Sequence, residues 1–541
     1  MKPNRAREDA ASRGLTFYRP TAFWFGVLAV IAGVLAHLPM YLMGRDNGYR
    51  LVGMPMDATM LAGMAAIIVG LAVSLYGLVP PASANGAGAE SRIRVAALDD
   101  VPLGPAHYRL LLAMALAVTI DVMKPTALAF VMPGMAQEYA LKSPLVPTGT
   151  TPVVLIALAS AVGTVCGSFL WGWLGDRIGR RASILYAGIA FMGTSICGAM
   201  PSFTWNLVMC FIMGLAVGGM LPICYALLAE TIPARHRGWV MILIGGDIAG
   251  AYVLTSWLSA ELVPLFSWRI LWLIGLPTGA LFIVLNRWMP ESPRFLLRHG
   301  REAQARIVMA RYGAAIVESE LAQQPTARSI DAWSQLVSPR LRTSSIVIGC
   351  LAISSGLVLF GFNLWIPTNL RMLGFAQPDA LLRNAALMGF PLTFVVAWMY
   401  GFWSSKGTVI ALTSLTAAAL FAFALAPDFV LGHRSVLYIL LTVPIWGVSS
   451  VVAVVSVYSA EIYPTGVRSR GTGYAAGASK AGGVAIIAST ALGLAAPSIG
   501  NIALVGAVSM TLSAILMFVC GVETRKQRLE DIRQTHSTTA V

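Results

Sequence analysis

The chain has little charge. Only 11% of its 541 residues are Asp, Glu, Lys or Arg, whereas a soluble globular protein carries about 25%. At the same time 57% of the residues are hydrophobic, and the mean hydropathy is +0.73. Too few polar residues remain to cover so much apolar surface in water. We therefore exclude a soluble enzyme, a nucleic-acid-binding protein and a disordered chain, and expect an all-α polytopic membrane protein.

Cysteine is also scarce, and no His or Cys cluster is present. The six cysteines lie inside apolar runs and have the spacing of neither a disulfide framework nor a metal site. No nucleotide-binding loop and no catalytic arrangement of charged residues is evident. We expect no metal, no cofactor and no enzymatic activity. The net charge of +14 is explained by Lys and Arg in cytoplasmic loops rather than by nucleic acid.

Fourteen apolar runs are long enough to cross a bilayer. Two form an N-terminal membrane extension over 1–79, with spans near 20–43 and 57–79, and a linker rich in Pro, Gly, Ala and Ser occupies 80–108. Two blocks of six spans follow, over 109–297 and 344–521. A cytoplasmic loop, 298–343, separates the blocks, and a cytoplasmic tail covers 522–541. The spans of the two blocks lie near 109–132, 152–174, 182–200, 205–228, 239–260, 268–289, 344–367, 384–403, 408–426, 435–458, 472–496 and 500–521.

The positions of Lys and Arg support this topology. With the N-terminus in the cytoplasm, 29 of the 38 basic residues fall on the cytoplasmic side and seven on the opposite side. Lys124 and Lys480 remain inside spans. Such a bias across alternating loops is typical of a correct span count and orientation. Both termini are therefore expected in the cytoplasm.

Three motifs recur in the second block at nearly the same offset from the first. Glu230-x-x-Pro-x-x-x-Arg237 returns as Glu461-x-x-Pro-x-x-x-Arg468. The loop motif that begins at Gly172 has an eroded counterpart that begins at Gly401, and Pro-Glu291 matches Val-Glu523. Two six-helix halves related by a repeat, with a central site between them, are typical of a transporter.

These residues carry a family resemblance. Gly172-Trp-Leu-Gly-Asp-Arg-Ile-Gly-Arg-Arg resembles the loop 2–3 signature of the major facilitator superfamily, and Pro290-Glu-Ser-Pro-Arg-Phe resembles its sugar-porter branch. The stretch around Glu461-Ile-Tyr-Pro-Thr-Gly-Val-Arg resembles the metabolite and aromatic-acid:proton symporters most. The resemblance covers about 415 of the 541 residues, and the first two spans have no counterpart in it. It implies the major facilitator fold, transport by alternating access, a bacterial inner membrane and a monomer.

The repeated motifs lie at cytoplasmic helix ends, where they indicate a gate. Glycine permits close helix packing and tight turns, a carboxylate accepts bonds from a helix N-terminus, and arginines offer bidentate partners. We expect these charges to hold the cytoplasmic side shut. The alternative is that they only fix topology. The expected gating residues are Gly172, Asp176, Arg177, Gly179, Arg180, Arg181, Glu230, Arg237, Glu461 and Arg468.

Charges inside spans are costly and point to function. Asp121 and Lys124 are three residues apart on core helix 1, a spacing that puts both on one face. Sugar-porter relatives place an arginine on helix 4 opposite such an acid, but Cys210 occupies that position here. We therefore expect Lys124 to pair with Asp121, either as a proton-coupling pair or as a structural ion pair. Asp247, on core helix 5, is a second intramembrane acid. Lys480 lies either in the pathway or near the cytoplasmic end, where it snorkels.

Helix 7 carries Gly361-Phe-Asn363-Leu-Trp365, which resembles the sugar porters. The glutamine pair of that family is missing, and Ser456 stands where its tryptophan is expected. A sugar needs many such donors and acceptors, so a sugar substrate is disfavoured. Asn363 and Trp365 are candidate pocket residues, although Trp365 is equally explained as an interfacial anchor.

We expect a secondary transporter that takes up a small organic acid with a proton, its partners being the substrate, the proton and the lipid bilayer. Lys124 and Lys480 suit an anion. The alternative is a proton-driven drug or metabolite efflux antiporter. Such antiporters carry a Gly-Pro pair in helix 5, whereas Gly245–Gly250 contains no proline. A sensor built on the same fold remains a further alternative.

Overall fold

The computed structural model describes residues 17–80, 98, 101–143, 146–314, 334–339, 341–375, 377–463, 468–492 and 498–525. Most of the expected linker and tail, and much of the expected cytoplasmic loop, lie outside these residues. The side chains of Asp176 and Arg468 are also outside the description, so their expected gating contacts stay predictions.

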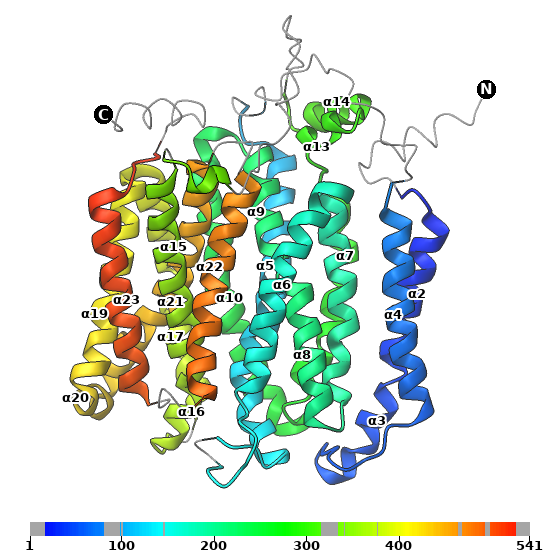
Figure 1. Ribbon diagram of the computed structural model, residues 1–541, viewed down its shortest axis with the longest axis vertical. Helices are drawn as coiled ribbons and strands as arrows, with labels where there is room; N and C mark the ends of the chain where they lie inside the picture. Colours follow the sequence, from blue (N-terminus) through cyan, green and yellow to red (C-terminus); the bar gives the residue numbers. More distant parts are fainter. Residues whose placement is uncertain are drawn as a thin grey trace, which may run out of the picture.

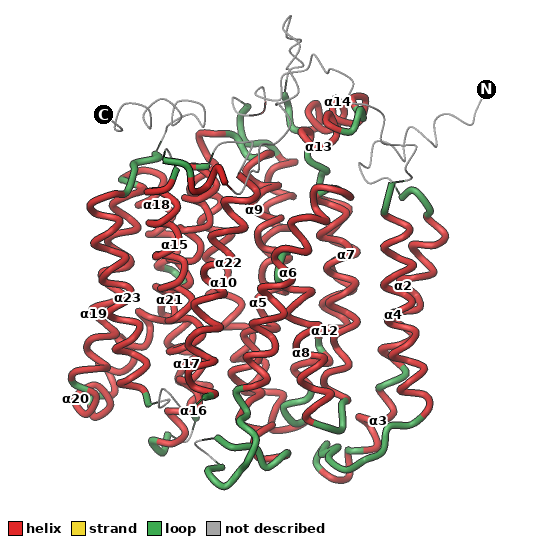
Figure 2. The backbone as a smooth tube through the Cα atoms, in the orientation of Figure 1, coloured by secondary structure: helices red, strands yellow, loops and turns green. Residues whose placement is uncertain are grey.

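Helices make up the described chain (Figures 1 and 2). The N-terminal extension contains α2 (Pro20–Leu35), α3 (Leu38–Met43) and α4 (Ala58–Leu78). The N-terminal half contains α5 (Pro105–Glu138), α6 (Leu155–Ile178), α7 (Arg180–Gly193), α8 (Phe203–Val217), α9 (Met220–Thr231), α10 (Ala234–Phe266), α11 (Ile270–Leu273) and α12 (Gly275–Leu285). Two short helices, α13 (Pro293–Arg298) and α14 (Glu302–Arg311), follow it.

The C-terminal half contains six spans of the same kind. They are built from α15 (Arg342–Leu357), α16 (Leu364–Met372), α17 (Pro378–Gly389), α18 (Leu392–Trp398), α19 (Ser405–Leu425), α21 (Arg434–Ile462), α22 (Arg468–Ala491) and α23 (Ile499–Cys520), with the short α20 (Pro427–Gly432) between α19 and α21. One π-helical segment joins α15 to α16 and another follows α18.

Thirteen helices of the described chain are long and apolar enough to cross a membrane. The 24-residue α22 has a comparable length, but its glycines, serines and Lys480 make it less apolar. The thirteen match thirteen of the expected spans, and α22 lies at the position of the remaining one, near 472–496. The composition of α22 has a physical reason, because this helix lines the cavity between the halves.

The two halves pack through a few long helices (Figure 1). α10 lies against α17 and α21, α6 against α22, and α5 against α16. Small residues allow close approach within each half. At Gly214 a Cβ would overlap the Ser160 carbonyl of α6, and at Gly356 a Cβ would overlap the Ser479 carbonyl of α22.

The N-terminal extension lies at the edge of the bundle, where α2 and α4 pack on α7 (Figure 1). Gly33 of α2 faces the Gly63 carbonyl of α4 so closely that a Cβ would lie 2.5 Å from it. The Tyr41 hydroxyl donates to the Phe266 carbonyl at 2.8 Å, and the Leu51 N–H donates to Glu138 Oε1 at 2.9 Å. The extension is therefore docked on the N-terminal half.

Figure 1 also shows that α2 begins and α23 ends at the end of the bundle that carries α13 and α14. We refer to this end as the α13 end, and to the opposite end, which carries α16 and α20, as the α16 end.

Candidate substrate site and gate

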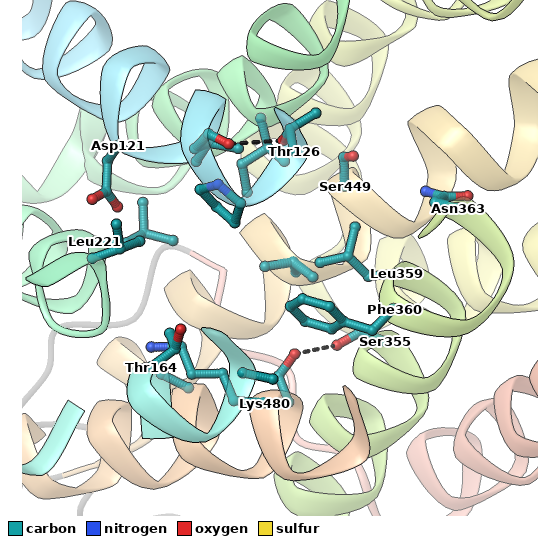
Figure 3. A pocket seen from close by; sticks show the side chains of 18 of the residues that line it. Asp121, Thr126, Thr164, Leu221, Ser355, Leu359, Phe360, Asn363, Ser449 and Lys480 are labelled. Carbon is teal, nitrogen blue, oxygen red and sulfur yellow. Dashed lines mark hydrogen bonds between the residues drawn. The ribbon is translucent and has the colours of Figure 1, made fainter. Parts of the chain in front are cut away.

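A cavity of about 180 Å³ lies between the two halves (Figure 3). α5, α6, α8, α9 and α10 line it from one half; α15, α16, α21 and α22 line it from the other. Its wall is mainly apolar, with residues such as Leu221, Leu359 and Phe360. No residue of α2, α3 or α4 is among the described lining residues. A mainly apolar cavity with a few polar groups is typical of a small-molecule site.

Three buried polar atoms of lining residues have no hydrogen-bond partner in the described chain. They are Asp121 Oδ1, the Tyr252 hydroxyl and Asn363 Oδ1. Asp121 is 3% exposed, Tyr252 8% and Asn363 4%. Buried polar atoms are nearly always satisfied in folded proteins, so these three are candidates to bind the polar groups of a substrate.

Lys480 joins the two halves at the cavity wall. It lies on α22, but its Nζ donates to Ser168 Oγ of α6 at 2.6 Å and to the Gly218 carbonyl between α8 and α9. Figure 3 shows Asp121 and Lys480 on different walls of the cavity. The snorkelling alternative is therefore wrong, because Lys480 lines the central cavity.

The expected Asp121–Lys124 pair is absent. Lys124 Nζ donates to the Phe191 carbonyl at 2.8 Å and to Thr194 Oγ1 at 2.6 Å, and it lies 4.1 Å from the centre of the Phe191 ring. Residues three apart on a helix are offset by about 60°, because three steps turn about 300° around the axis. This offset is enough for the two side chains of α5 to contact different neighbouring helices. Asp121 lines the central cavity, whereas Lys124 lines a separate small pocket beside α7 and α12.

Two other candidates also lie outside the central cavity. Asp247 lines a lateral pocket between α5, α10 and α18, where it accepts a hydrogen bond from Thr119 Oγ1. Trp365 is 3% exposed and is not among the lining residues, so it is neither a pocket wall nor an exposed interfacial anchor. Asn363 does line the cavity.

The sequence reasoning missed Tyr252 and Phe360. Tyr252 is a hydroxyl-bearing aromatic residue inside an apolar span, one turn after Ile248, and both side chains line the cavity. That spacing was a usable signal. Phe360 lies in the π-helical segment, whose altered register is not visible in the sequence.

Three of the expected gate residues of the N-terminal half, Arg180, Arg181 and Glu230, join one network with Glu291 and Ser292 at the α13 end. The Arg180 guanidinium lies 3.8 Å from Glu230 Oε1, and Ser292 Oγ donates to Glu230 Oε2. Glu291 Oε1 accepts from the N–H groups of Arg180 at 2.8 Å and Arg181 at 3.4 Å. The network ties the start of α7 to the segment before α13.

The two glycines of the loop motif differ. Gly179 has φ +99°, and a Cβ there would overlap the Glu291 carboxylate, so the turn requires glycine. Gly172 has open space around its Cβ position, and the expectation that it supports close packing is wrong. Arg177 stacks on the Trp173 ring at 4.4 Å.

The C-terminal half repeats this arrangement with other donors. Glu461 Oε2 accepts from the Tyr400 hydroxyl at 2.7 Å and from Thr524 Oγ1 at 2.6 Å. Arg237 donates to the Ile232 carbonyl at 3.3 Å. A Cβ at the next residue, Gly238, would lie 3.6 Å from Glu461 Oε1. The start of α10 therefore faces Glu461 across the boundary between the halves.

The comparisons with known proteins agree with this architecture. The family described as sugar (and other) transporter matches residues 126–536. The niacin transporter NiaP of Acinetobacter baylyi is 25% identical over 448 residues, which cover 81% of this chain and 99% of NiaP. The 4-hydroxybenzoate transporter PcaK of Pseudomonas putida is 27% identical over 401 residues, 72% of this chain and 86% of PcaK.

A metabolite transport protein of the Escherichia coli inner membrane, YgcS, is 29% identical over 351 residues, 61% of this chain and 73% of YgcS. Among solved structures, the proton:xylose symporter XylE matches with a TM-score of 0.65 at 18% identity, covering 79% of this chain and 98% of that one.

Proposed function

The chain belongs to the sugar (and other) transporter family of the major facilitator superfamily, and on that premise we propose that it imports a small aromatic or heteroaromatic carboxylic acid together with a proton. Membership makes it a multi-pass secondary transporter and not an enzyme. The named relatives include transporters of niacin and of 4-hydroxybenzoate, two acids with one ring.

The observation that carries the proposal is the charge inside the cavity. Asp121 and Lys480 are its two charged lining residues in the described chain, and the rest of the wall is mainly apolar. Lys480 provides an ammonium for a carboxylate, while Phe360 and Leu359 provide surface for a flat ring. The unpartnered Tyr252 hydroxyl and Asn363 Oδ1 suit a ring nitrogen or hydroxyl.

Charge balance supplies a coupling mechanism. Without substrate, an ionised Asp121 and a charged Lys480 leave the cavity neutral. A bound carboxylate adds one negative charge, which is costly in a low-dielectric site. A proton on Asp121 restores neutrality, so substrate anion and proton favour each other's binding, and this preference is reciprocal.

Lys480 also connects binding to movement. Its hydrogen bonds to Ser168 and Gly218 cross the boundary between the halves. The ammonium has three N–H donors, and a substrate carboxylate that accepts one of them pulls the ammonium toward the cavity, so binding weakens this link. The two halves then rock about the occupied site, as in other transporters built from repeats.

We place the transporter in a bacterial inner membrane as a monomer, with both termini and the α13 end in the cytoplasm. The excess of Lys and Arg in the loops assigned to that side supports this orientation. In this orientation the Arg180–Glu230–Glu291 network and the Glu461 cluster form the cytoplasmic gate. Residues 1–79 are an extension that lies outside the transport pathway.

Uptake into proteoliposomes tests the proposal. Nicotinate and 4-hydroxybenzoate are offered with and without an acidic exterior. Nicotinamide and xylose are the comparison compounds; nicotinamide has the ring of nicotinate without its charge. We expect gradient-driven accumulation of at least one acid, sensitive to a protonophore, and none of nicotinamide or xylose. Accumulation of xylose, or acid uptake that ignores the proton gradient, contradicts the proposal.

A further inference from the structure

A second pocket opens on the side of the bundle. It has a volume of about 270 Å³ and lies between α5, α10 and α18. Leu112 and Phe394 on its rim are 55% and 58% exposed, and in a membrane such apolar rim residues face lipid. The volume is near the lower limit for small-molecule pockets. The pocket is therefore open to a compact molecule dissolved in the bilayer.

An acid lies in this pocket. Asp247 accepts a hydrogen bond from Thr119 Oγ1, which also lies 3.0 Å from the Ala115 carbonyl. The Thr119 hydroxyl has one hydrogen, so it can donate to Asp247 or to the Ala115 carbonyl but not fully to both. A carboxylate accepts about four hydrogen bonds, so Asp247 retains capacity for further donors. No Lys, Arg or His is among the described lining residues of the pocket.

The remaining polar and aromatic groups favour a cation. Thr393 of α18 is 4% exposed, lines the same pocket and has no hydrogen-bond partner for Oγ1 in the described chain. Phe390 and Phe394 form an edge-to-face pair with ring centres 6.2 Å apart, and Trp239 also lines the pocket. Aromatic rings stabilise an ammonium close to their faces.

We propose that this lateral pocket binds a compact lipophilic amine in its ammonium form, which enters from the bilayer. The ammonium donates to Asp247 and to Thr393 Oγ1, and the apolar body packs on Phe390, Phe394 and Trp239. The site is separate from the central cavity, which Asp247 does not line.

Occupancy has a consequence for transport. α10 and α18 belong to opposite halves and meet closely, since a Cβ at Gly246 would overlap the Thr393 side chain. A ligand that holds Asp247 and Thr393 together bridges the halves beside this contact. It therefore opposes their relative movement and inhibits transport without competing for the substrate.

Equilibrium binding of tritiated 1-adamantylamine to the full chain in nanodiscs tests the proposal. Two competitors have the same cage, 1-adamantanol without charge and 1-adamantanecarboxylate with a negative charge. We expect saturable binding of the labelled amine. Unlabelled 1-adamantylamine should displace it, and 1-adamantanecarboxylate should not. Asp247→Asn weakens binding about tenfold or more, as expected for the loss of one charge-assisted hydrogen bond, and Thr393→Val weakens it several-fold.

Asp121→Asn is the matched control, because it removes the acid of the central cavity, and binding of the amine is expected to be unchanged. Each variant is compared only after size-exclusion chromatography shows that it is folded and monodisperse. Equal binding by wild type and both pocket variants, loss of binding in Asp121→Asn, or equal competition by the carboxylate overturns the proposal. Binding is measured without transport, so this outcome leaves the proposed substrate untouched.

Discussion

Glu291 and Glu523 make equivalent contacts in the two halves. Each accepts a hydrogen bond from the backbone N–H of the first residue of a helix, Arg180 of α7 at 2.8 Å and Ser405 of α19 at 2.9 Å. Both glutamates follow the last membrane span of their half by a few residues, and each caps the third span of that half. The repeat is therefore preserved as a contact even where the loop motif itself has been lost.

The surroundings of the two carboxylates differ, and so does their ionisation. Burial raises the pKa of Glu291 above its ordinary 4.5, although three backbone N–H groups and the charge of Arg180 oppose the shift. The pKa of Glu523 is lowered instead. Burial alone would raise it, but the hydrogen bonds from Ser404, Ser405 and the Arg525 N–H have the larger combined effect.

These shifts predict opposite pH dependences of stability. A raised folded pKa means that the stabilising contribution of Glu291 falls as pH rises above 4.5. A lowered pKa means that the contribution of Glu523 is present above 4.5 and is lost on acidification. The melting temperature of wild type relative to Glu291→Gln should therefore decrease from pH 4 to pH 8. The same difference for Glu523→Gln should decrease from pH 5 to pH 3; parallel curves for the two variants contradict the assignment.

The sequence predicted the fold well because the membrane imposes simple rules. A span must satisfy its backbone internally and be apolar over about 20 residues, so length and hydropathy reveal it. The predicted alignment of the two halves was less accurate in detail. Pairing Gly172 with Gly401 places the counterpart of Arg180 at Val409, inside α19, whereas that helix begins earlier, at Ser405. The feature that the two halves share is a helix start capped by a glutamate, and not the residue sequence of the loop before it.

The site was predicted only in part. Asp121 and Lys480 were found because charged residues in apolar spans are conspicuous, and Asn363 was found through the resemblance of helix 7 to the sugar porters; all three line the cavity. Lys124 and Asp247 are equally conspicuous, yet they face other pockets. Sequence spacing gives the face of one helix, but which helix packs against that face is decided by tertiary contacts. Lys124 illustrates this, since its partners lie far along the chain, at the end of α7 and just beyond it.

Lys480→Met is expected to weaken binding of the substrate carboxylate about tenfold or more, the loss expected for one hydrogen bond to a charged group. The matched control is Lys124→Met, which removes a buried lysine from the small pocket beside α7. Its substrate affinity should stay within about twofold of wild type. Calorimetric titration of purified protein measures both. Similar losses in the two variants would mean that the anion does not contact Lys480.

A shortened chain that begins at Leu103 is expected to keep transport but to melt at a lower temperature. It loses the bonds from Tyr41 to Phe266 and from Leu51 to Glu138, whereas Glu138 keeps its buried ion pair with Arg269 at 2.6 Å. Uptake and thermal unfolding are measured on the same preparation. A shortened chain that is correctly inserted and stable but inactive contradicts a location outside the pathway.

Gly401→Val is expected to favour opening at the α13 end. A Cβ at Gly401 would lie 2.9 Å from Trp239 Cβ, at a contact between the C-terminal and N-terminal halves. Gly432→Val is the control, because nothing lies within 4 Å of its Cβ position. The readout is labelling of a cysteine at Ala475, which lines the cavity, in a chain whose native cysteines are replaced by serine. A membrane-impermeant thiol reagent applied from the α13 end should react faster in Gly401→Val only. Equal rates in both variants exclude this contact from the gate.

Asp121→Asn is expected to abolish accumulation and to preserve exchange. Uptake of one proton with one monocarboxylate moves no net charge, so wild type should respond to a pH gradient and not to membrane potential. A gradient of one pH unit then supports about tenfold accumulation, since one unit corresponds to about 1.4 kcal/mol. Asparagine keeps the size of the side chain but carries no exchangeable acid.

The variant should therefore equilibrate labelled nicotinate or 4-hydroxybenzoate across proteoliposomes, and exchange internal for external substrate, while accumulating none. Asp247→Asn is the control, because this acid lies in the lateral pocket, and its accumulation should match wild type. If Asp121→Asn still concentrates substrate under a pH gradient, charge balance between Asp121 and Lys480 is not the coupling mechanism. Loss of accumulation in Asp247→Asn as well would place a second proton outside the central cavity.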